Sequence, residues 1–221
     1  MIKKILITGT SSGLGHELAK KLSKKYFVFG LSRSLGKSKN LNFKKFKHSK
    51  LDLSNFEDVN RLKFSNIDCL INNASIFLMK PFDKINNREI IEIINTNLIG
   101  TILLTKKIIQ NNKKLKKIIN ILSVSSLNGI KNQSVYSASK HGLKGFFDSL
   151  SQENLNKISI NNIFPGGIKT ELWNKYPKIK KEQYKGFLDT KDIVKYVQSI
   201  LDNRGKIITK NITLFPNNDW H

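Results

Sequence analysis

Tyr136 and Lys140 could form a proton-transfer site together with Ser123. Residues 135–140 read Val-Tyr-Ser-Ala-Ser-Lys, and Ser123 lies thirteen residues before the tyrosine. If the stretch after Ser134 is helical, Tyr136 and Lys140 share one face of the helix, because they are four residues apart. An ammonium beside the phenol would favour the phenolate and so lower its pKa. The spacing therefore predicts a tyrosine that exchanges protons near neutral pH.

A glycine-rich turn near the start of the chain could bind a phosphate group. The apolar run Ile5 to Ile7 predicts a short buried strand, residues 8–15 read Thr-Gly-Thr-Ser-Ser-Gly-Leu-Gly, and an amphipathic helical run continues through Lys25. Glycines suit a tight reversal and a close approach of a pyrophosphate, and the helix would offer unpaired N–H groups. A turn without a ligand is the alternative. The candidate contacts are Gly9, Ser11, Ser12, Gly13, Leu14 and Gly15.

Together these residues resemble the short-chain dehydrogenase/reductase family, whose pattern has Thr-Gly-x-x-x-Gly-x-Gly near the start, then Ser and Tyr-x-x-x-Lys. The resemblance covers nearly the whole chain. Its further landmarks appear in order: Asp52-Leu53 after the third strand, Asn72-Asn73-Ala74 at the end of the fourth, Asn97 in a long helix, and Pro165-Gly166 with Thr170 after the sixth. Ser75 and Ser126 stand where the family usually has Gly, and neither change removes a catalytic group.

The resemblance implies the reaction and the residue roles. A hydride would pass between nicotinamide C4 and a carbonyl carbon, while Tyr136 gives or takes the proton at oxygen, so the protein's work is positioning and electrostatics. Ser123 would hydrogen-bond the reacting oxygen, Lys140 would also bind the nicotinamide ribose, and Asn97 would complete the proton relay. The other implied cofactor contacts are Asp52 and Leu53 at adenine, Asn73 and Ala74 on the adenosine side, Ile168 and Thr170 at the carboxamide, and Pro165 and Gly166.

The order of apolar and helical stretches predicts the fold. Apolar runs at residues 2–7, 26–31, 69–71, 118–122 and 158–164 alternate with helical stretches, and a last strand is expected at 212–215. This α/β alternation favours a Rossmann-type, doubly wound parallel sheet of about seven strands with helices on both faces, in a single domain over residues 1–221. A ligand should then lie at the carboxyl ends of the strands.

Two helix starts can be located from their capping residues. The run Ser54-Asn55-Phe56-Glu57 predicts a capping box that opens one helix. A second helix is expected from about Asn86 into the region of Lys106 and Lys107, with Asn97 in its interior.

The net charge is strongly positive, with 39 Lys and Arg against 16 Asp and Glu, a formal +23. Such an excess can indicate nucleic-acid binding, which is the non-enzymatic alternative. The lysines are dispersed in small clusters without an aromatic-interleaved RNA motif, so a solvated surface is the better interpretation. Only four residues are arginine and three are alanine, whereas Lys, Asn and Ile are abundant, a composition typical of A/T-rich codon usage.

Cysteine, histidine and hydropathy exclude other classes of protein. The one cysteine, Cys69, lies in an apolar run, so we expect a buried thiol and no internal disulfide. The four histidines have no metal-ligand spacing, and the sequence predicts no metal. The apolar run after Met1-Ile2-Lys3-Lys4 is too short for a signal peptide, and no stretch is long enough to span a membrane. We expect a soluble cytoplasmic protein.

Arg33 bears on the choice between NADP and NAD. The end of the second strand, residues 29–34, contains no acidic residue that could accept bonds from a ribose diol, whereas Arg33 could pair with a 2′-phosphate. This favours NADP, with NAD as the alternative. Ser12 stands where many NADP-binding relatives carry a basic residue, which argues in the other direction.

The sequence leaves the substrate open. It is expected to be a small carbonyl or alcohol, and the segment Glu171 to Leu188 contains Trp173, Tyr176, Tyr184 and Phe187, which could form an aromatic lid or could simply pack under a loop. Relatives commonly pair through the helices that contain Asn97 and Tyr136, so a homodimer or homotetramer is expected. A catalytically inactive dinucleotide sensor is the alternative function within the fold.

Overall fold

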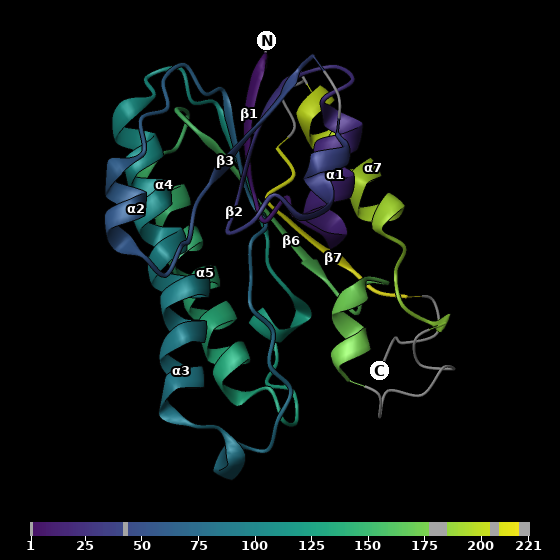
Figure 1. The fold of residues 1–221 in the computed structure, drawn as a ribbon. Coiled ribbons are helices and arrows are strands. Elements are labelled where there is room, and N and C mark those ends of the chain that lie inside the picture. Colours follow the sequence, from purple (N-terminus) through teal and green to yellow (C-terminus); the bar gives the residue numbers. More distant parts are fainter. Residues whose placement is uncertain (1, 42–43, 177–184, 204–207, 217–221) are drawn as a thin grey trace.

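One parallel sheet forms the centre of the molecule. The computed structural model describes residues 2–41, 44–176, 185–203 and 208–216, and its seven-stranded sheet is shown in Figure 1. In spatial order the strands are β3 (Phe46–Lys50), β2 (Phe27–Ser32), β1 (Lys4–Thr8), β4 (Cys69–Asn72), β5 (Lys117–Ile121), β6 (Ser159–Pro165) and β7 (Asn211–Leu214). The strand order reverses between β1 and β4, which is where a ligand is expected in such a sheet.

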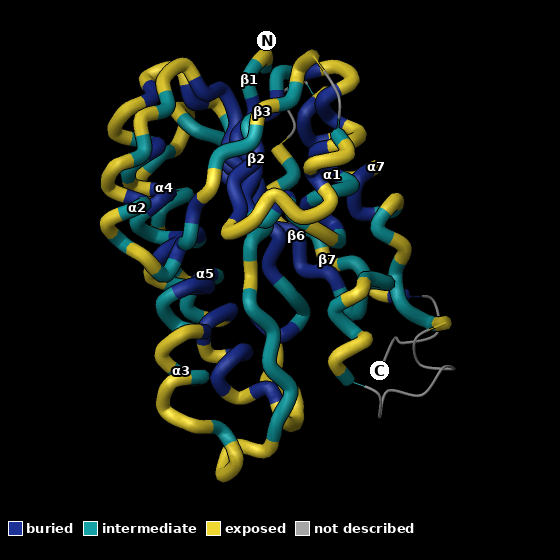
Figure 2. The backbone as a smooth tube through the Cα atoms, viewed as in Figure 1, coloured by how far each residue is buried: buried dark blue, intermediate teal, exposed yellow. Residues whose placement is uncertain are grey.

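Helices cover both faces of the sheet. On one face α1 (Gly13–Leu22) and α7 (Thr190–Asp202) pack on a core that contains Leu18 and Val197. On the other face α2 (Phe56–Arg61), α4 (Gly100–Asn111) and α5 (Ser134–Glu153) pack on a core that contains Leu104 and Phe147. Figure 2 shows the buried strands between these two layers. The predicted Rossmann-type, doubly wound fold is confirmed.

The predicted strands agree closely with those observed. Each of the six apolar runs falls within two residues of a strand, and Cys69 is buried as expected. β3 gave a weaker signal because it lies at the edge of the sheet and alternates half-buried with exposed residues. The first helix ends at Leu22, three residues before the expected end at Lys25.

The predicted capping box at residues 54–57 is wrong by one residue. Asn55, not Ser54, caps α2, and its side chain accepts bonds from the N–H groups of Glu57 and Asp58. Ser54 is unavailable because its N–H and Oγ both donate to Oδ1 of Asp52, at 2.9 and 2.7 Å. This local turn moves the start of the helix one residue along the chain.

The long helix expected from Asn86 is present but is interrupted. A capping box between Asn86 and Glu89 opens α3 (Asn87–Ile93), the π-helical turn η3 (Ile94–Ile99) follows, and α4 continues to Asn111. π-Helical turns occur often at functional sites, because they redirect side chains within a helix. Here the turn carries Asn97.

A row of asparagine amides crosses four neighbouring strands in register. The Nδ2 of Asn72 donates to Asn120, that of Asn120 to Asn162, and that of Asn162 to Asn211, at 2.9, 2.9 and 3.1 Å. Each pair consists of register partners in adjacent strands. Because a slip by one residue would break every bond of the row, it helps to fix the alignment of β4 to β7.

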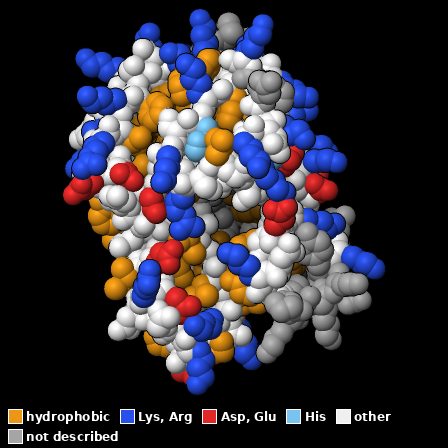
Figure 3. Space-filling model, viewed as in Figure 1, with side chains coloured by type: hydrophobic (Ala, Val, Ile, Leu, Met, Phe, Trp, Pro, Cys, Tyr) orange, Lys and Arg blue, Asp and Glu red, His pale blue; other side chains and the backbone are white. Residues whose placement is uncertain are grey.

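The positive charge of the chain is distributed over the surface. Figure 3 shows Lys and Arg side chains spread over the visible face of the molecule rather than gathered on one element. Among the described residues, no helix combines the length and the apolar character that crossing a bilayer requires.

Candidate active site

A pocket of about 600 Å³ opens at the carboxyl ends of the strands. Its lining includes Thr8 at the end of β1, Ser32 at the end of β2 and Pro165 at the end of β6. Of the residues that the sequence singled out as a site, Asn97 alone is outside this lining. The others are Gly9, Ser11, Ser12, Gly13, Leu14, Gly15, Arg33, Asp52, Leu53, Asn73, Ala74, Ser123, Tyr136, Lys140, Pro165, Gly166, Ile168 and Thr170.

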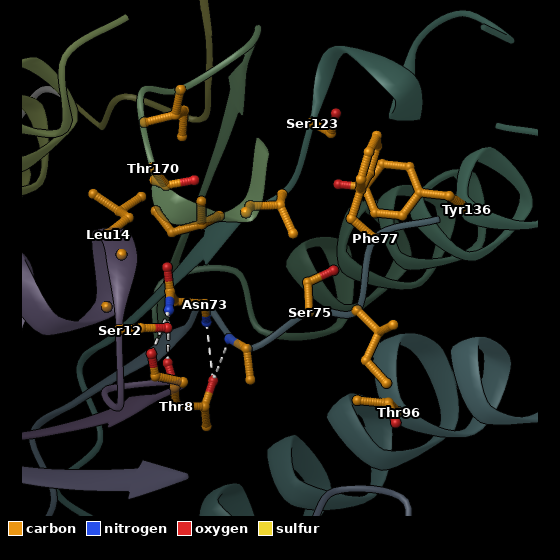
Figure 4. A pocket seen from close by; sticks show the side chains of 18 of the residues that line it. Thr8, Ser12, Leu14, Asn73, Ser75, Phe77, Thr96, Ser123, Tyr136 and Thr170 are labelled. Atoms are coloured by element: carbon orange, nitrogen blue, oxygen red, sulfur yellow. Dashed lines mark hydrogen bonds between the residues drawn. The ribbon is translucent and has the colours of Figure 1, made fainter. Parts of the chain in front are cut away.

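The glycine-rich turn requires glycine at specific points. Gly9 has φ +75°, and a Cβ added there would lie 2.8 Å from the Cα of Ala74. At Gly15 an added Cβ would lie 2.1 Å from the carbonyl oxygen of Gly9, so the start of α1 packs directly on the turn. Thr8 joins the turn to the neighbouring strand, because its Oγ1 accepts bonds from the N–H groups of Asn73 and Ala74 at 2.9 and 3.0 Å (Figure 4).

This turn fits the pyrophosphate of a dinucleotide. Ser12, the N-cap of α1, makes no side-chain capping bond, and the first turn of the helix contains no acidic residue. The N–H groups at the start of α1 therefore have no capping side chain among the described residues, and the helix dipole favours an anion there. Gly13 has φ +53°, and a Cβ added there would point toward Thr170 across the pocket, at 3.5 Å.

A loop from the end of β2 packs over the same turn. The N–H of Lys37 donates to the carbonyl oxygen of Ser11 at 2.7 Å, and Oγ of Ser38 donates to that of Thr10 at 2.6 Å. The ammonium of Lys37 also pairs with Glu171 beyond β6. The two loops that flank the glycine turn are thus joined by an ion pair.

Arg33 lines the pocket just after β2 but points toward an acidic neighbour. Its Nη1 is 3.4 Å from Oε1 of Glu92 on α3, and both side chains are about half exposed. No acidic residue stands at the end of β2, as the sequence indicated. Asp52 lines the pocket with one carboxylate oxygen bonded to Ser54.

Tyr136, Lys140 and Ser123 meet at the other end of the pocket. The Nζ of Lys140 lies 5.6 Å from the centre of the Tyr136 ring and donates to the carbonyl oxygen of Ile121 at 3.4 Å. The Oγ of Ser123 accepts a bond from the N–H of Ser125 at 3.1 Å, and its hydroxyl also interacts with that of Tyr136. Two neighbouring serines are weaker candidates for this hydroxyl, because Ser126 is buried outside the pocket lining and Oγ of Ser125 donates to Oε1 of Gln133 at 3.0 Å.

The pKa of Tyr136 departs from the sequence prediction. Burial raises it to about 12, and the hydroxyls of Ser123 and Ser75 act in the opposite direction. Burial also lowers the pKa of Lys140 to about 8. The predicted lowering of the tyrosine pKa by the ammonium is therefore wrong for this structure, because the loss of water around both groups is the larger effect. The phenol keeps its proton at neutral pH.

Asn97 is buried beneath the pocket rather than in it. Its Oδ1 accepts the N–H of Ile76 at 2.7 Å, and its Nδ2 donates to the carbonyl oxygen of Ile76 at 2.8 Å and to Oγ of Ser139 at 3.2 Å. The side chain is thus fully occupied as a donor. Its part in a proton relay stays a prediction.

Ser75 and Phe77 are pocket residues that the sequence did not assign to the site. They flank Ile76 in the segment after β4, and Figure 4 shows both beside Tyr136. The ring of Phe77 stands edge-on to that of Tyr136, with centroids 4.9 Å apart. Ser75 was noted only as a departure from Gly, and nothing in the pattern of Phe77 separates it from a core residue.

The chain is similar in sequence to a known family and to several curated proteins. The model of the short chain dehydrogenase family matches residues 3–181. The 3-oxoacyl-[acyl-carrier-protein] reductase FabG of Buchnera aphidicola subsp. Baizongia pistaciae is 34% identical over 232 residues, which cover 95% of this chain and 94% of that protein. Retinol dehydrogenase 8 of Bos taurus is 31% identical over 78% of this chain, but the match spans only 61% of that protein, as it also does for the human protein.

Two solved structures illustrate the similarity of fold. 4-Hydroxyisoleucine dehydrogenase complexed with NADH is 27% identical, with a TM-score of 0.82 and 97% of each chain covered. The closed form of serine dehydrogenase complexed with NADP+ is 22% identical, with a TM-score of 0.87, and the match covers 99% of this chain and 96% of that one. The second likeness bears on the fold alone.

Proposed function

The chain belongs to the short chain dehydrogenase family, and on that premise we propose that it interconverts a carbonyl and an alcohol with a nicotinamide dinucleotide, preferably NADP(H). The observation that carries the proposal is one continuous pocket with two ends. A glycine turn and an uncapped helix start lie at one end, and Tyr136, Lys140 and Ser123 lie at the other. The proposal treats the chain as one dinucleotide-binding domain.

In this proposal the residues around Tyr136 handle the proton and the oxygen. The dinucleotide, when bound, supplies or accepts the hydride. For reduction, Ser123 donates a hydrogen bond to the carbonyl oxygen and Tyr136 gives that oxygen its proton, so the carbonyl gains a hydride at carbon and a proton at oxygen. A phenol with a pKa raised to about 12 holds its proton at neutral pH, which suits a proton donor. For oxidation the transfers are reversed.

Lys140, which lines the pocket, and Asn97, which is buried beneath it, support this chemistry. The ammonium of Lys140 would bind the nicotinamide ribose, because its Nζ has the Ile121 carbonyl as its hydrogen-bond acceptor at 3.4 Å and retains other donors. Asn97 would belong to the proton relay. Its bonds to Ile76 support a positioning role in addition.

The preference for NADP rests on Arg33. The described end of β2 offers no carboxylate to a ribose diol, and Arg33 lies where a guanidinium could pair with a 2′-phosphate. Glu92 competes for the same guanidinium at 3.4 Å. A phosphate would therefore have to replace that carboxylate as the partner of Arg33.

A symmetric oligomer also belongs to the proposal. Ile91 on α3 and Ile99 in η3 are exposed apolar residues on the interrupted helix that carries Asn97, through which pairing is expected. Light scattering during size exclusion should report a dimer or a tetramer, and a monomer at micromolar concentration would contradict it.

The test of the proposal is a fluorescence titration with NADPH and with NADH at moderate salt, which suppresses nonspecific attraction to the basic surface. Saturable binding with preference for NADPH is expected. Gly13→Ala should weaken binding, because Gly13 has φ +53° at the phosphate end of the pocket, whereas Gly129→Ala has no atom within 4 Å of the added Cβ and serves as the matched control. Binding of neither dinucleotide would refute the proposal.

Turnover is tested separately with Tyr136→Phe. The variant should bind the dinucleotide like the unmodified protein and lose carbonyl turnover, because it lacks only the proton donor. Turnover equal to that of the unmodified protein would rule out the proposed role of Tyr136. Dinucleotide binding with no turnover of any carbonyl would favour the sensor function instead.

A further inference from the structure

Aromatic rings form one wall of the pocket beside Tyr136. Phe77 is the central ring, with centroid distances of 4.9 Å to Tyr136, 5.3 Å to Trp173 and 5.4 Å to Tyr176. All three contacts are edge-on, with interplanar angles of 63° to 80°. Phe77 and Trp173 both line the pocket. Tyr184, which the sequence also suggested for this segment, lies outside the described residues.

The polar atoms of these rings are occupied by backbone groups. The indole Nε1 of Trp173 donates to the carbonyl oxygen of Ile168 at 2.7 Å. The hydroxyl of Tyr176 donates to the carbonyl oxygen of Phe77 at 3.1 Å and accepts the N–H of Met79 at 3.4 Å. The wall therefore offers carbon surface rather than hydrogen-bonding groups to a substrate.

The wall is supported from behind. The ring of Phe187 packs against that of Trp173 with centroids 4.8 Å apart. It also lies directly over Gly167, where an added Cβ would approach the ring to 2.7 Å. Of the aromatic residues that the sequence singled out in this segment, Trp173 lines the pocket, whereas Phe187 packs behind it.

Two kinds of charged group lie near this wall: exposed residues at its rim, and the buried Lys140 beside Tyr136, which the proposed function assigns to the nicotinamide ribose. Among the described lining residues of the short helix η5 (Glu171–Lys175), Glu171 and Lys175 are charged, and both are exposed. Glu171 is already paired with Lys37. Beside Tyr136, the hydroxyls of Ser123 and Ser75 could bind a substrate oxygen. A charge next to the reacting carbon would lose its hydration without gaining a partner from this wall.

We propose that the substrate is an uncharged ketone or aldehyde, or the matching alcohol, whose reacting carbon carries an aromatic or other flat apolar group that packs on Phe77 and Trp173. The inference rests on the proposed oxidoreductase function and adds the class of substrate. Edge-on and stacked contacts between rings stabilise such a complex beyond the burial of apolar area alone. The carbonyl oxygen then faces Tyr136 and Ser123.

The test compares carbonyls of similar size with the dinucleotide that binds. Acetophenone represents the proposed class, 2-octanone has an apolar but flexible chain, and benzoylformate places a carboxylate next to the carbonyl. The value of kcat/KM for acetophenone should exceed those of the other two by at least about tenfold. Phe77→Ala should remove that preference by about the same factor, and Phe64→Ala, a half-buried ring outside the pocket lining, should leave it unchanged.

A binding measurement makes the test independent of turnover. The sequence has two tryptophans, Trp173 and Trp220, so a Trp220→Phe background leaves Trp173 as the reporter. Acetophenone should quench its fluorescence saturably, and Phe77→Ala should weaken that binding, with thermal melts to show that each variant is folded. Equal or tighter binding of benzoylformate, or binding that ignores Phe77, would overturn the inference. Because dinucleotide titration is measured separately, that result would leave the proposed function standing.

Discussion

The side-chain amide of Asn97 holds both backbone polar groups of Ile76. Its Oδ1 lies 2.7 Å from the Ile76 nitrogen and its Nδ2 lies 2.8 Å from the Ile76 oxygen. The two residues next to Ile76 are Ser75 and Phe77, which both line the pocket beside Tyr136. Asn97 therefore helps to set the position of the residues around the phenol without itself lining the pocket.

Asn97→Ala should lower both stability and turnover. Loss of the amide leaves two part-buried backbone groups of Ile76 without partners, which costs about 2 to 4 kcal/mol of unfolding free energy. Urea unfolding gives that number. The matched control is Asn112→Ala, another buried asparagine bonded to backbone, at Ile67 and Phe64. Both variants should lose stability, and Asn97→Ala alone should lower kcat. Equal turnover in the two variants would contradict the positioning role.

Ser75→Gly should shift the titration of Tyr136 upward. The hydroxyl of Ser75 acts to lower the tyrosine pKa against the effect of burial. Without it the phenol keeps its proton to higher pH, so the limb of the pH–rate profile that reports Tyr136 should move to higher pH. The phenolate absorbance of the unmodified protein minus that of Tyr136→Phe measures the same pKa directly.

The second departure from the family pattern supplies the control for Ser75. Ser126 is buried, lies outside the pocket lining, and its Oγ has no partner among the described residues. Ser126→Gly should therefore leave the titration of Tyr136 unchanged. A downward shift for Ser75→Gly, or the same shift in both variants, would disprove the link between Ser75 and the phenol.

Lys140→Met should stabilise the protein at neutral pH. The pKa of Lys140 is lowered from 10.5 to about 8 by burial, so the unfolded chain binds the proton more tightly than the folded one. Below pH 8 the folded state carries the full cost of the buried charge, about 3 kcal/mol, and between pH 8 and 10.5 that cost disappears as the folded state loses the proton. The variant should thus be more stable at pH 7 and lose its advantage by about pH 10.

Unfolding by urea at several pH values measures this difference. Lys144→Met on the same helix, where the lysine pairs with Asp148 at a part-exposed position, is the control and should show no such pH window. An advantage of Lys140→Met that grows from pH 8 to pH 10 would have the wrong sign and would contradict the burial argument.

Arg33 and Glu92 should affect dinucleotide choice in opposite directions. Arg33→Ala should weaken the binding of NADPH by about tenfold and leave the binding of NADH nearly unchanged, since it removes a partner of the 2′-phosphate. Glu92→Gln should strengthen the binding of NADPH by about two- to fivefold, because the exposed ion pair at 3.4 Å no longer competes with the 2′-phosphate for Arg33. Fluorescence titration of each variant with both dinucleotides checks this.

The control for the ion pair is Arg61, which pairs with Glu57 on α2 away from the pocket lining. Arg61→Ala removes the same kind of side chain and the same net charge. If it weakened NADPH as much as Arg33→Ala does, the effect would come from the overall positive charge, and the specific role of Arg33 would be wrong.

Sequence patterns predicted most of the fold because they report local burial. The apolar runs located six strands. The glycine turn and the Tyr136–Lys140 spacing predicted residues at the two ends of the pocket. These signals depend on neighbours within a few residues along the chain. The sequence signal for the edge strand β3 was weaker, because this strand buries few of its side chains.

What the sequence missed depends on contacts between distant segments. Phe77 became a pocket residue only because the loop after β4 meets Trp173 and Tyr176, about a hundred residues further along. The direction of the Tyr136 pKa shift depends on how fully the phenol is buried, which spacing alone does not reveal. The bonds of Asn97 to Ile76 and Ser139 likewise join segments that are 21 and 42 residues apart along the chain.

The row of asparagines across the sheet should be costly to interrupt at its centre. Asn120 is fully buried, accepts a bond from Asn72 and donates one to Asn162, each at 2.9 Å. Asn120→Leu should lower the unfolding free energy by about 2 to 5 kcal/mol, because both neighbours lose a partner in the interior. Asn211→Leu, at the exposed end of the row on β7, breaks one bond and should cost less than about 1 kcal/mol. Urea unfolding of the two variants decides the matter: equal losses would show that the row contributes no more in the core than it does at the edge.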